Sequence, residues 1–228
     1  MHQYDQGDAP VDLEELDMVQ APCWLGVDLS KNEDLTAVVA AWRDGDDGYQ
    51  VMPWFFCPEE NLRDRGDRHG VPYAEWAEQG FIIPTPGNTV DLRAVEAHIR
   101  ELCGRFNVRE VAFDPTYGRS MMADLDQDGI PVVEFRQSWV SMAPAVKELE
   151  RAILGGRFKH AGHPVLRWNF ENIQLHVDQA GNRSFHKGKS GNKIDGAVAT
   201  AMAVARAAAG DVQFITEASW FEDDFFLA

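Results

Sequence analysis

Cysteine is scarce in this chain of 228 residues, which holds only Cys23, Cys57 and Cys103. They are odd in number, scattered and without a Cys-x-x-Cys pair, a pattern that favours buried thiols in a reducing compartment over a disulfide framework. Long apolar runs are absent too: none approaches the ~20 residues that cross a bilayer, and the N-terminus has no apolar signal core. We therefore expect a soluble, cytosolic protein that makes no contact with a membrane.

Basic residues are also in short supply. Lysine and arginine number 21 against 37 aspartates and glutamates, so the net charge is −16. Because proteins bind duplexes largely by neutralising phosphates, this balance argues against a strong stand-alone nucleic-acid binder. An enzyme of this composition that acts on nucleic acid would need another component to deliver it to its substrate.

Much of the acidic excess lies at the two ends of the chain. We interpret residues 1–20 as an acidic N-terminal linker and residues 211–228 as an acidic, aromatic C-terminal tail. That leaves residues 21–210 as one folded domain. The apolar fraction of 45% is ample for a buried core at this size.

The hydrophobic pattern predicts a mixed α/β sheet with helices on both faces. Its first three strands should form an antiparallel meander, because the turn signal Asp44-Gly45-Asp46-Asp47-Gly48 separates two of them. The alternation of helix and strand that follows is typical of parallel strands added beside the first. Strands are predicted near 23–30, 35–42, 49–57, 81–83, 108–114 and 130–135, a hairpin at 174–187, and helices near 73–79, 92–106, 118–128, 146–153 and 195–209.

Three aspartates, Asp28, Asp114 and Asp195, stand where a predicted strand ends or a predicted helix begins. If the strand at 108–114 pairs beside the first, Asp28 and Asp114 become neighbours, and the last helix can present Asp195 to them. Converging carboxylates repel one another unless a cation lies between them, and hard oxygen donors suit Mg²⁺ or Mn²⁺. Two ions about 4 Å apart, bridged by Asp28, would clamp the attacking and leaving oxygens of a phosphodiester. The leading interpretation is a metal-dependent nuclease.

Each aspartate also has an ordinary structural explanation. Asp28 can begin a turn, Asp114 can form an Asp-Pro turn with Pro115, and Asp195 can cap free N–H groups at a helix start. Asp34, six positions after Asp28, is either an auxiliary metal ligand or a solvated turn residue.

A cluster of basic residues precedes Asp195 in this otherwise acidic chain. These side chains can contact the DNA backbone or stabilise charge that builds on the scissile phosphate. The alternative is a solvated hairpin tip. The basic residues concerned are His186, Lys187, Lys189 and Lys193.

Several short motifs occur in a specific order between about residue 22 and about residue 209. They are Gly26-Val27-Asp28-Leu29-Ser30 with Asp34-Leu35-Thr36-Ala37, Pro72-Tyr73-Ala74-Glu75-Trp76, Thr85-Pro86-Gly87, Ala112-Phe113-Asp114-Pro115, Gln137-Ser138, Met142-Ala143-Pro144-Ala145-Val146-Lys147-Glu148-Leu149-Glu150 and Lys193-Ile194-Asp195-Gly196-Ala197-Val198-Ala199. In these motifs the chain resembles the nuclease domain of the large terminase subunit of tailed bacteriophages, a branch of the RNase H-like fold.

This resemblance implies an endonuclease that uses two Mg²⁺ or Mn²⁺ ions to cut concatemeric, double-stranded viral DNA during genome packaging in the host cytoplasm. Asp28, Asp114 and Asp195 match the metal-binding acidic positions of the family. The full family protein also carries a packaging ATPase with a phosphate loop. Here the one Gly-Lys-Ser is Gly188-Lys189-Ser190, and Arg183 stands where that loop requires glycine. We expect an excised C-terminal domain without the ATPase, working with that ATPase and with the small terminase subunit and portal.

Two other classes of function remain open at this point. An actin-like phosphotransferase also uses an aspartate after its first strand, but it needs a glycine-rich phosphate loop there, and Leu29-Ser30-Lys31-Asn32 contains no glycine. A non-catalytic docking module of the packaging machinery would use the acidic ends of the chain. Nuclease activity that depends on Mn²⁺ separates the leading interpretation from both.

Overall fold

The computed structural model describes residues 1–30, 35–60, 62–186 and 193–210. The predicted site residues Asp34, Lys187 and Lys189 lie outside the described residues, as does the predicted C-terminal tail at 211–228. No helix within the described ranges is long and apolar enough to cross a membrane.

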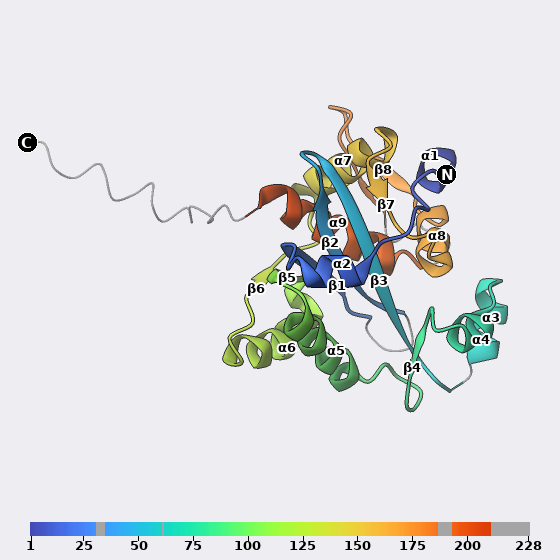
Figure 1. Cartoon of the computed structure of the whole chain (residues 1–228). Coiled ribbons are helices and arrows are strands. Elements are labelled where there is room, and N and C mark those ends of the chain that lie inside the picture. Colours follow the sequence, from blue (N-terminus) through green and yellow to red (C-terminus); the bar gives the residue numbers. More distant parts are fainter. Residues whose placement is uncertain (31–34, 61, 187–192, 211–228) are drawn as a thin grey trace, which may run out of the picture.

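A mixed sheet with β1 near its centre forms the body of the protein (Figure 1). The antiparallel meander is confirmed, because β2 pairs antiparallel with both β1 and β3. On the other side of β1, β5 pairs with it in parallel, and β6 continues the sheet in parallel beside β5. The strands are β1 (Cys23–Asp28), β2 (Thr36–Asp44), β3 (Gly48–Pro58), β4 (Ile83–Thr85), β5 (Val108–Phe113) and β6 (Val132–Glu134), with β4 and the short β7 (Phe158–Lys159) parallel to β3.

Helices cover the two faces of this sheet. Figure 1 shows α5 and α6 grouped together, away from α7, α8 and α9. Side chains alternate along β1, so Leu25 joins the core on the α5–α6 side and Trp24 joins the core on the α7–α9 side. The helices are α5 (Leu92–Arg105), α6 (Pro115–Gln127), α7 (Trp139–Leu154), α8 (Pro164–Glu171) and α9 (Asp195–Ala209); a separate pair, α3 (Leu62–His69) and α4 (Tyr73–Glu78), lies beside β4.

The alanine-rich helix α9 lies directly on the sheet. Its small side chains let the helix approach β1 so closely that a Cβ added to Gly26 would lie 2.1 Å from the carbonyl oxygen of Ala199. At the other end of the helix, Arg206 makes two hydrogen bonds to the carboxylate of Glu110 on β5, at 2.5 and 2.8 Å. The position of α9 across the sheet is therefore set by backbone contact and by a largely buried ion pair.

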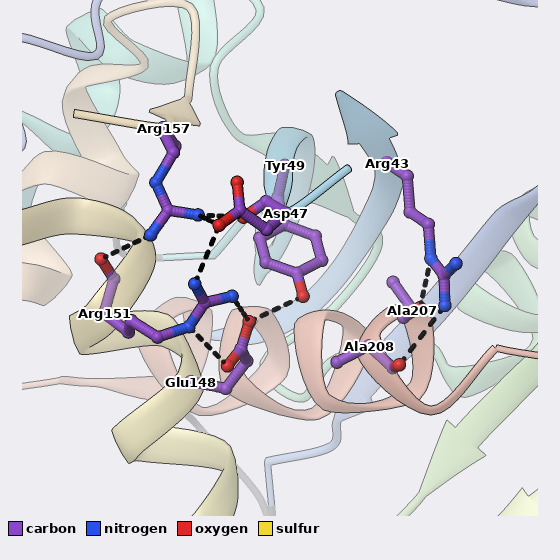
Figure 2. A network of polar contacts seen from close by, with 8 residues as sticks. All are labelled: Arg43, Asp47, Tyr49, Glu148, Arg151, Arg157, Ala207 and Ala208. Carbon is purple, nitrogen blue, oxygen red and sulfur yellow. Dashed lines mark hydrogen bonds and ion pairs between the residues drawn. The ribbon is translucent and has the colours of Figure 1, made fainter. Parts of the chain in front are cut away.

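A polar network ties the helices to the turn between β2 and β3 (Figure 2). Arg151 on α7 bonds both Glu148 and Asp47, and Glu148 accepts a 2.7 Å hydrogen bond from the hydroxyl of Tyr49. Beside it, the guanidinium of Arg43 donates to the carbonyl oxygens of Ala207 and Ala208, which satisfies acceptors in the last turn of α9. This network lies at the opposite end of β2 from Thr36, the residue with which that strand begins.

Residues 1–20 differ from the expected linker. They contain α1 (His2–Asp5) and α2 (Leu13–Met18), and the Tyr4 side chain is 3% exposed. The Tyr4 ring stacks on His160, whose Nε2 lies 2.7 Å from the carbonyl oxygen of Tyr4. Three acidic residues of this segment pair with arginines of the domain: Asp5 with Arg167, and Glu14 and Asp17 with Arg105. The segment is part of the folded unit, because Tyr4, Val11 and Leu16 are all buried in the core.

Two further differences concern element boundaries. Helix α6 begins at Pro115 rather than at 118, since proline is favoured in the first turn of a helix. Strand β4 runs over Ile83–Thr85 rather than over 81–83; at a sheet edge its Pro84 removes no required donor. The helices α3 and α8 were not predicted. The hairpin was, and it forms from β8 (Leu175–Val177) and β9 (Arg183–Phe185).

Candidate active site

Asp28 and Asp114 come together because their strands are parallel neighbours. Val27 on β1 pairs with Phe113 on β5, and the two aspartates follow these residues directly. Both line a pocket of about 220 Å³, together with Leu29, Thr116, Tyr117 and Gln137. Asp28 is only 3% exposed. The expectation that Asp28 and Asp114 are neighbours at one edge of the sheet is confirmed.

Asp114 combines a structural contact with its place in the pocket. It is the N-cap of α6, where its Oδ1 accepts a 2.8 Å hydrogen bond from the backbone N–H of Thr116. Its Oδ2 accepts a second one, at 3.0 Å, from the backbone N–H of Gln137. One main-chain donor on each oxygen fixes the plane of the carboxylate.

Gln137 joins the two aspartates. Besides the backbone bond to Asp114, its side-chain Nε2 donates a 2.7 Å hydrogen bond to Oδ1 of Asp28. The sequence predicted no role for Gln137, although it belongs to the Gln137-Ser138 motif. The signal that could have identified it is its place shortly after the predicted strand at 130–135, at the sheet edge where Asp114 follows its own strand.

Asp195 lies on the same face of the sheet, to one side of the pocket. It is the first residue of α9, and the next residue, Gly196, packs on Phe55 of β3. Phe55 stands opposite Ala37 on β2, and Ala37 stands opposite Asp28 on β1. Asp195 is not among the described residues that line the pocket.

The capping explanation for Asp195 receives no support from the start of α9. The N-cap position is Ile194, and it makes no side-chain cap hydrogen bond. The backbone N–H of Gly196 is instead bonded at 2.8 Å by Oδ1 of Asn169, a fully buried residue of α8. A side chain from another helix thus takes the capping role that we considered for Asp195.

Of the four predicted DNA-contacting residues, His186 and Lys193 fall within the described ranges. His186 follows β9, and its ring lies 6.0 Å from that of His176 on β8. Lys193 comes two residues before Asp195, and its carbonyl oxygen accepts a hydrogen bond from Asn172.

The donors in the pocket fit a hard divalent cation. Asp28 and Asp114 offer carboxylate oxygens from rigid strand ends, and such oxygens are the ligands that Mg²⁺ and Mn²⁺ prefer. A buried carboxylate is costly unless a donor or a cation compensates its charge. Within the described part of the chain, no three His, Cys, Asp or Glu side chains already form a group able to hold a metal ion.

Solved structures of phage terminases have this fold. The chain aligns with the HK97 bacteriophage large terminase at a TM-score of 0.77 and 35% identity, covering 89% of this chain and 42% of that one. It aligns with the large terminase nuclease of thermophilic phage G20c with bound magnesium at 0.51 and 15%, covering 82% of both chains. The nuclease domain of phage SPP1 g2p with bound Mn aligns at 0.50 and 13%, covering 83% of this chain and 89% of that one. The sheet is therefore of the RNase H-like class.

The sequence comparisons identify the family. The profile of the family described as terminase large subunit, endonuclease domain, matches residues 1–211. The terminase large subunit of Enterobacteria phage HK97 is 40% identical over 206 residues, which cover 90% of this chain and 40% of that protein. The chain belongs to the endonuclease-domain family of terminase large subunits, and it spans about two fifths of the length of this relative.

Proposed function

We propose that this chain is a metal-dependent endodeoxyribonuclease that cuts double-stranded, concatemeric viral DNA during genome packaging. The observation that carries the proposal is the pairing of a buried carboxylate, Asp28, with Asp114 in one pocket at the ends of two parallel strands. The membership of the chain in a nuclease-domain family supports hydrolysis over phosphotransfer of the actin type.

Asp28 and Asp114 are the residues that would hold divalent cations, with Asp195 completing the far side of Asp28. Bound Mg²⁺ or Mn²⁺, two ions in our proposal, would activate a water and stabilise charge on the scissile phosphate. The magnesium-bound G20c and Mn-bound SPP1 nucleases, which share the fold, support this choice of metals. Asp34 is a further candidate ligand.

In this proposal the chain's own residues orient the metal-binding carboxylates and bind the DNA. Main-chain donors from Thr116 and Gln137 hold the carboxylate of Asp114 in one plane, so that its oxygens have fixed directions. Basic side chains that precede α9 in the sequence would contact the DNA backbone. The residues in this role are His186, Lys187, Lys189 and Lys193.

Because the net charge of −16 disfavours DNA binding by this domain alone, the proposal includes a component that brings the domain to its DNA substrate. A packaging ATPase tethered to this domain would hold DNA at high effective concentration, so weak intrinsic binding would suffice. We propose that the domain works in the host cytoplasm with that ATPase, the small terminase subunit and the portal. The two-fifths coverage of the HK97 protein is consistent with such a larger assembly.

The test is cleavage of supercoiled plasmid by the purified chain. We expect nicking and linearisation with Mn²⁺ or Mg²⁺, none with a chelator, and none with Asp28→Asn, Asp114→Asn or Asp195→Asn. Asp124→Asn, at an exposed position of α6, is the matched control and should cut like the wild type. Intact plasmid after hours with Mn²⁺ would overturn the enzymatic proposal and leave a docking role. Normal cleavage by Asp195→Asn would remove that residue alone from the site.

A further inference from the structure

The connection between β6 and α7 brings Gln137 to the pocket by extending the sheet. Glu134 at the end of β6 pairs with Phe113, and the backbone N–H of Phe135 then donates to the carbonyl oxygen of Phe113 at 2.7 Å. Two residues later, the N–H of Gln137 meets Oδ2 of Asp114 at 3.0 Å. The main chain at Gln137 is thus placed by strand pairing, independently of its side chain.

The side chain of Gln137 then crosses from β5 to β1. Its Nε2 lies 2.7 Å from Oδ1 of Asp28 and 3.9 Å from Sδ of Met202, a fully buried residue of α9. A carboxylate oxygen accepts hydrogen bonds, and a thioether sulfur is a weak acceptor that cannot donate. Both neighbours therefore require the NH₂ group on this side, so the orientation of the amide is determined by its surroundings.

The bond to Asp28 is compatible with a bound cation. Each carboxylate oxygen has two lone pairs, so a hydrogen bond to Oδ1 does not by itself prevent a cation from binding the same carboxylate. The bond from Gln137 and a bound ion are therefore not mutually exclusive. A hydrogen bond of this kind fixes the rotation of a ligating carboxylate, and its loss typically costs about 10- to 100-fold in metal affinity or activity.

We propose that Gln137 is a positioning residue for the metal site: its amide fixes the rotation of Asp28, and its backbone N–H fixes that of Asp114, so one residue sets the relation between the two carboxylates. This inference rests on the proposed nuclease function. It adds that the arrangement of metal ligands depends on a neutral side chain from a third element, outside the three aspartates.

The test compares Mn²⁺ binding and cleavage in four variants. Gln137→Met keeps the length of the side chain and removes the donor, and Gln137→Asn keeps the amide on a shorter stem. Gln137→Glu replaces the donor with an acceptor. Gln20→Met is the matched control, because Nε2 of Gln20 makes a comparable bond, at 3.2 Å, to a carboxylate oxygen of Asp17 outside the pocket.

We expect Gln137→Met and Gln137→Asn to bind Mn²⁺ about 10- to 100-fold more weakly in calorimetric titrations without DNA. Saturating Mn²⁺ should restore most of their nicking rate, because the donor orients the ligands without touching the reacting atoms. Gln137→Glu should melt below Gln137→Met without metal, since it faces Asp28 with a like charge, and Mn²⁺ should raise its melting temperature more than it raises that of the wild type.

Three outcomes would count against this role. If Gln137→Met binds Mn²⁺ as tightly as the wild type, Gln137 does not position the ligands. An equal loss of affinity in Gln20→Met would mean that general destabilisation explains the effect. A wild-type chain that binds no Mn²⁺ would overturn the proposed function, and the positioning role would be overturned with it. The first two results would leave the proposed function standing.

Discussion

Gly26 of β1 and Ala199 of α9 are in contact through their backbones: a Cβ on Gly26 would lie 2.1 Å from the carbonyl oxygen of Ala199 and 2.8 Å from the backbone nitrogen of Ala203. No rotamer change can relieve such a contact, because both neighbours are main-chain atoms. The close spacing between β1 and α9 therefore depends on the absence of a Cβ at Gly26. Since β1 carries Asp28 and α9 carries Asp195, that spacing also sets the relation between two proposed ligands.

We predict that Gly26→Ala destabilises the protein by about 3 kcal/mol or more, because the added methyl group must push α9 away from the sheet. The displacement would carry Asp195 with it, so cleavage should fall further than the loss of folded protein explains. Urea denaturation measures the first effect, and plasmid nicking by the folded fraction measures the second.

Gly104→Ala is the control for this prediction. Gly104 lies in α5, and a Cβ there would meet no atom within 4 Å. Alanine at an exposed helical position should stabilise by about 0.5–1 kcal/mol. Equal stability of Gly26→Ala and the wild type would show that α9 is free to shift on the sheet.

Asp114 should reveal two separable roles. Asp114→Ala removes the acceptor for the N–H of Thr116 and should cost about 1–2 kcal/mol of stability, the usual effect of losing an N-cap. Asp114→Asn keeps one acceptor oxygen and should cost less. Both should lose cleavage, because neither supplies a second carboxylate. Full activity in Asp114→Asn, measured as plasmid nicking with Mn²⁺, would restrict this residue to capping.

Acid stability should depend on His163. Burial, followed by the neighbouring His160, lowers the pKa of His163 from 6.5 to about 4. The unfolded chain therefore takes up this proton first as the pH falls. The contribution of neutral His163 to the free energy of unfolding is complete above pH 6.5 and is lost progressively towards pH 4. Over that window it amounts to about 3 kcal/mol.

The measurement for this prediction is the free energy of unfolding against pH in the wild type and in His163→Asn. Nδ1 of His163 accepts from the backbone N–H of Leu166 at the start of α8, and asparagine is a favoured residue at that capping position. The variant should show a shallower decline between pH 6.5 and 4, whatever its absolute stability. Identical slopes would contradict a depressed pKa.

DNA binding by the isolated domain should be weak and steeply salt-dependent, given the net charge of −16. Replacing Lys187, Lys189 and Lys193 with alanine should reduce the salt slope by about 1 for each lysine that contacts a phosphate. Mn²⁺ affinity should change little. Fluorescence anisotropy with a labelled duplex and Ca²⁺ tests both statements. Tight binding near physiological salt by the triple variant would contradict our account of delivery.

The sequence was sufficient for those parts of the site that depend on neighbouring strands. Asp28 and Asp114 each follow a continuous apolar run, and parallel strands that are adjacent must bring such residues to one edge. The limits of α9 were also predicted, because an alanine-rich run between Asp195 and Gly210 has strong signals at both ends.

Other parts depend on contacts that no local pattern encodes. Gln137 reaches Asp28 through a register between β5 and β6 and a side chain that crosses to a third strand. Asn169 bonds the start of α9 from a helix that the sequence did not predict. Tyr4 is buried by ring contacts with residues more than 150 positions away. In each case the partner, rather than the residue itself, determines the role.

Arg43 has a practical consequence for experiments on immobilised protein. It holds the last turn of α9, and it stands six residues along β2 from Ala37, the residue opposite Asp28. Six residues of strand span about 20 Å. The main chain leaves the described domain at Gly210, on this remote edge. A biotin attached at Gly210 would keep the sensor surface on the side of the domain remote from the carboxylate pocket, so that a long DNA molecule held under tension can approach the pocket.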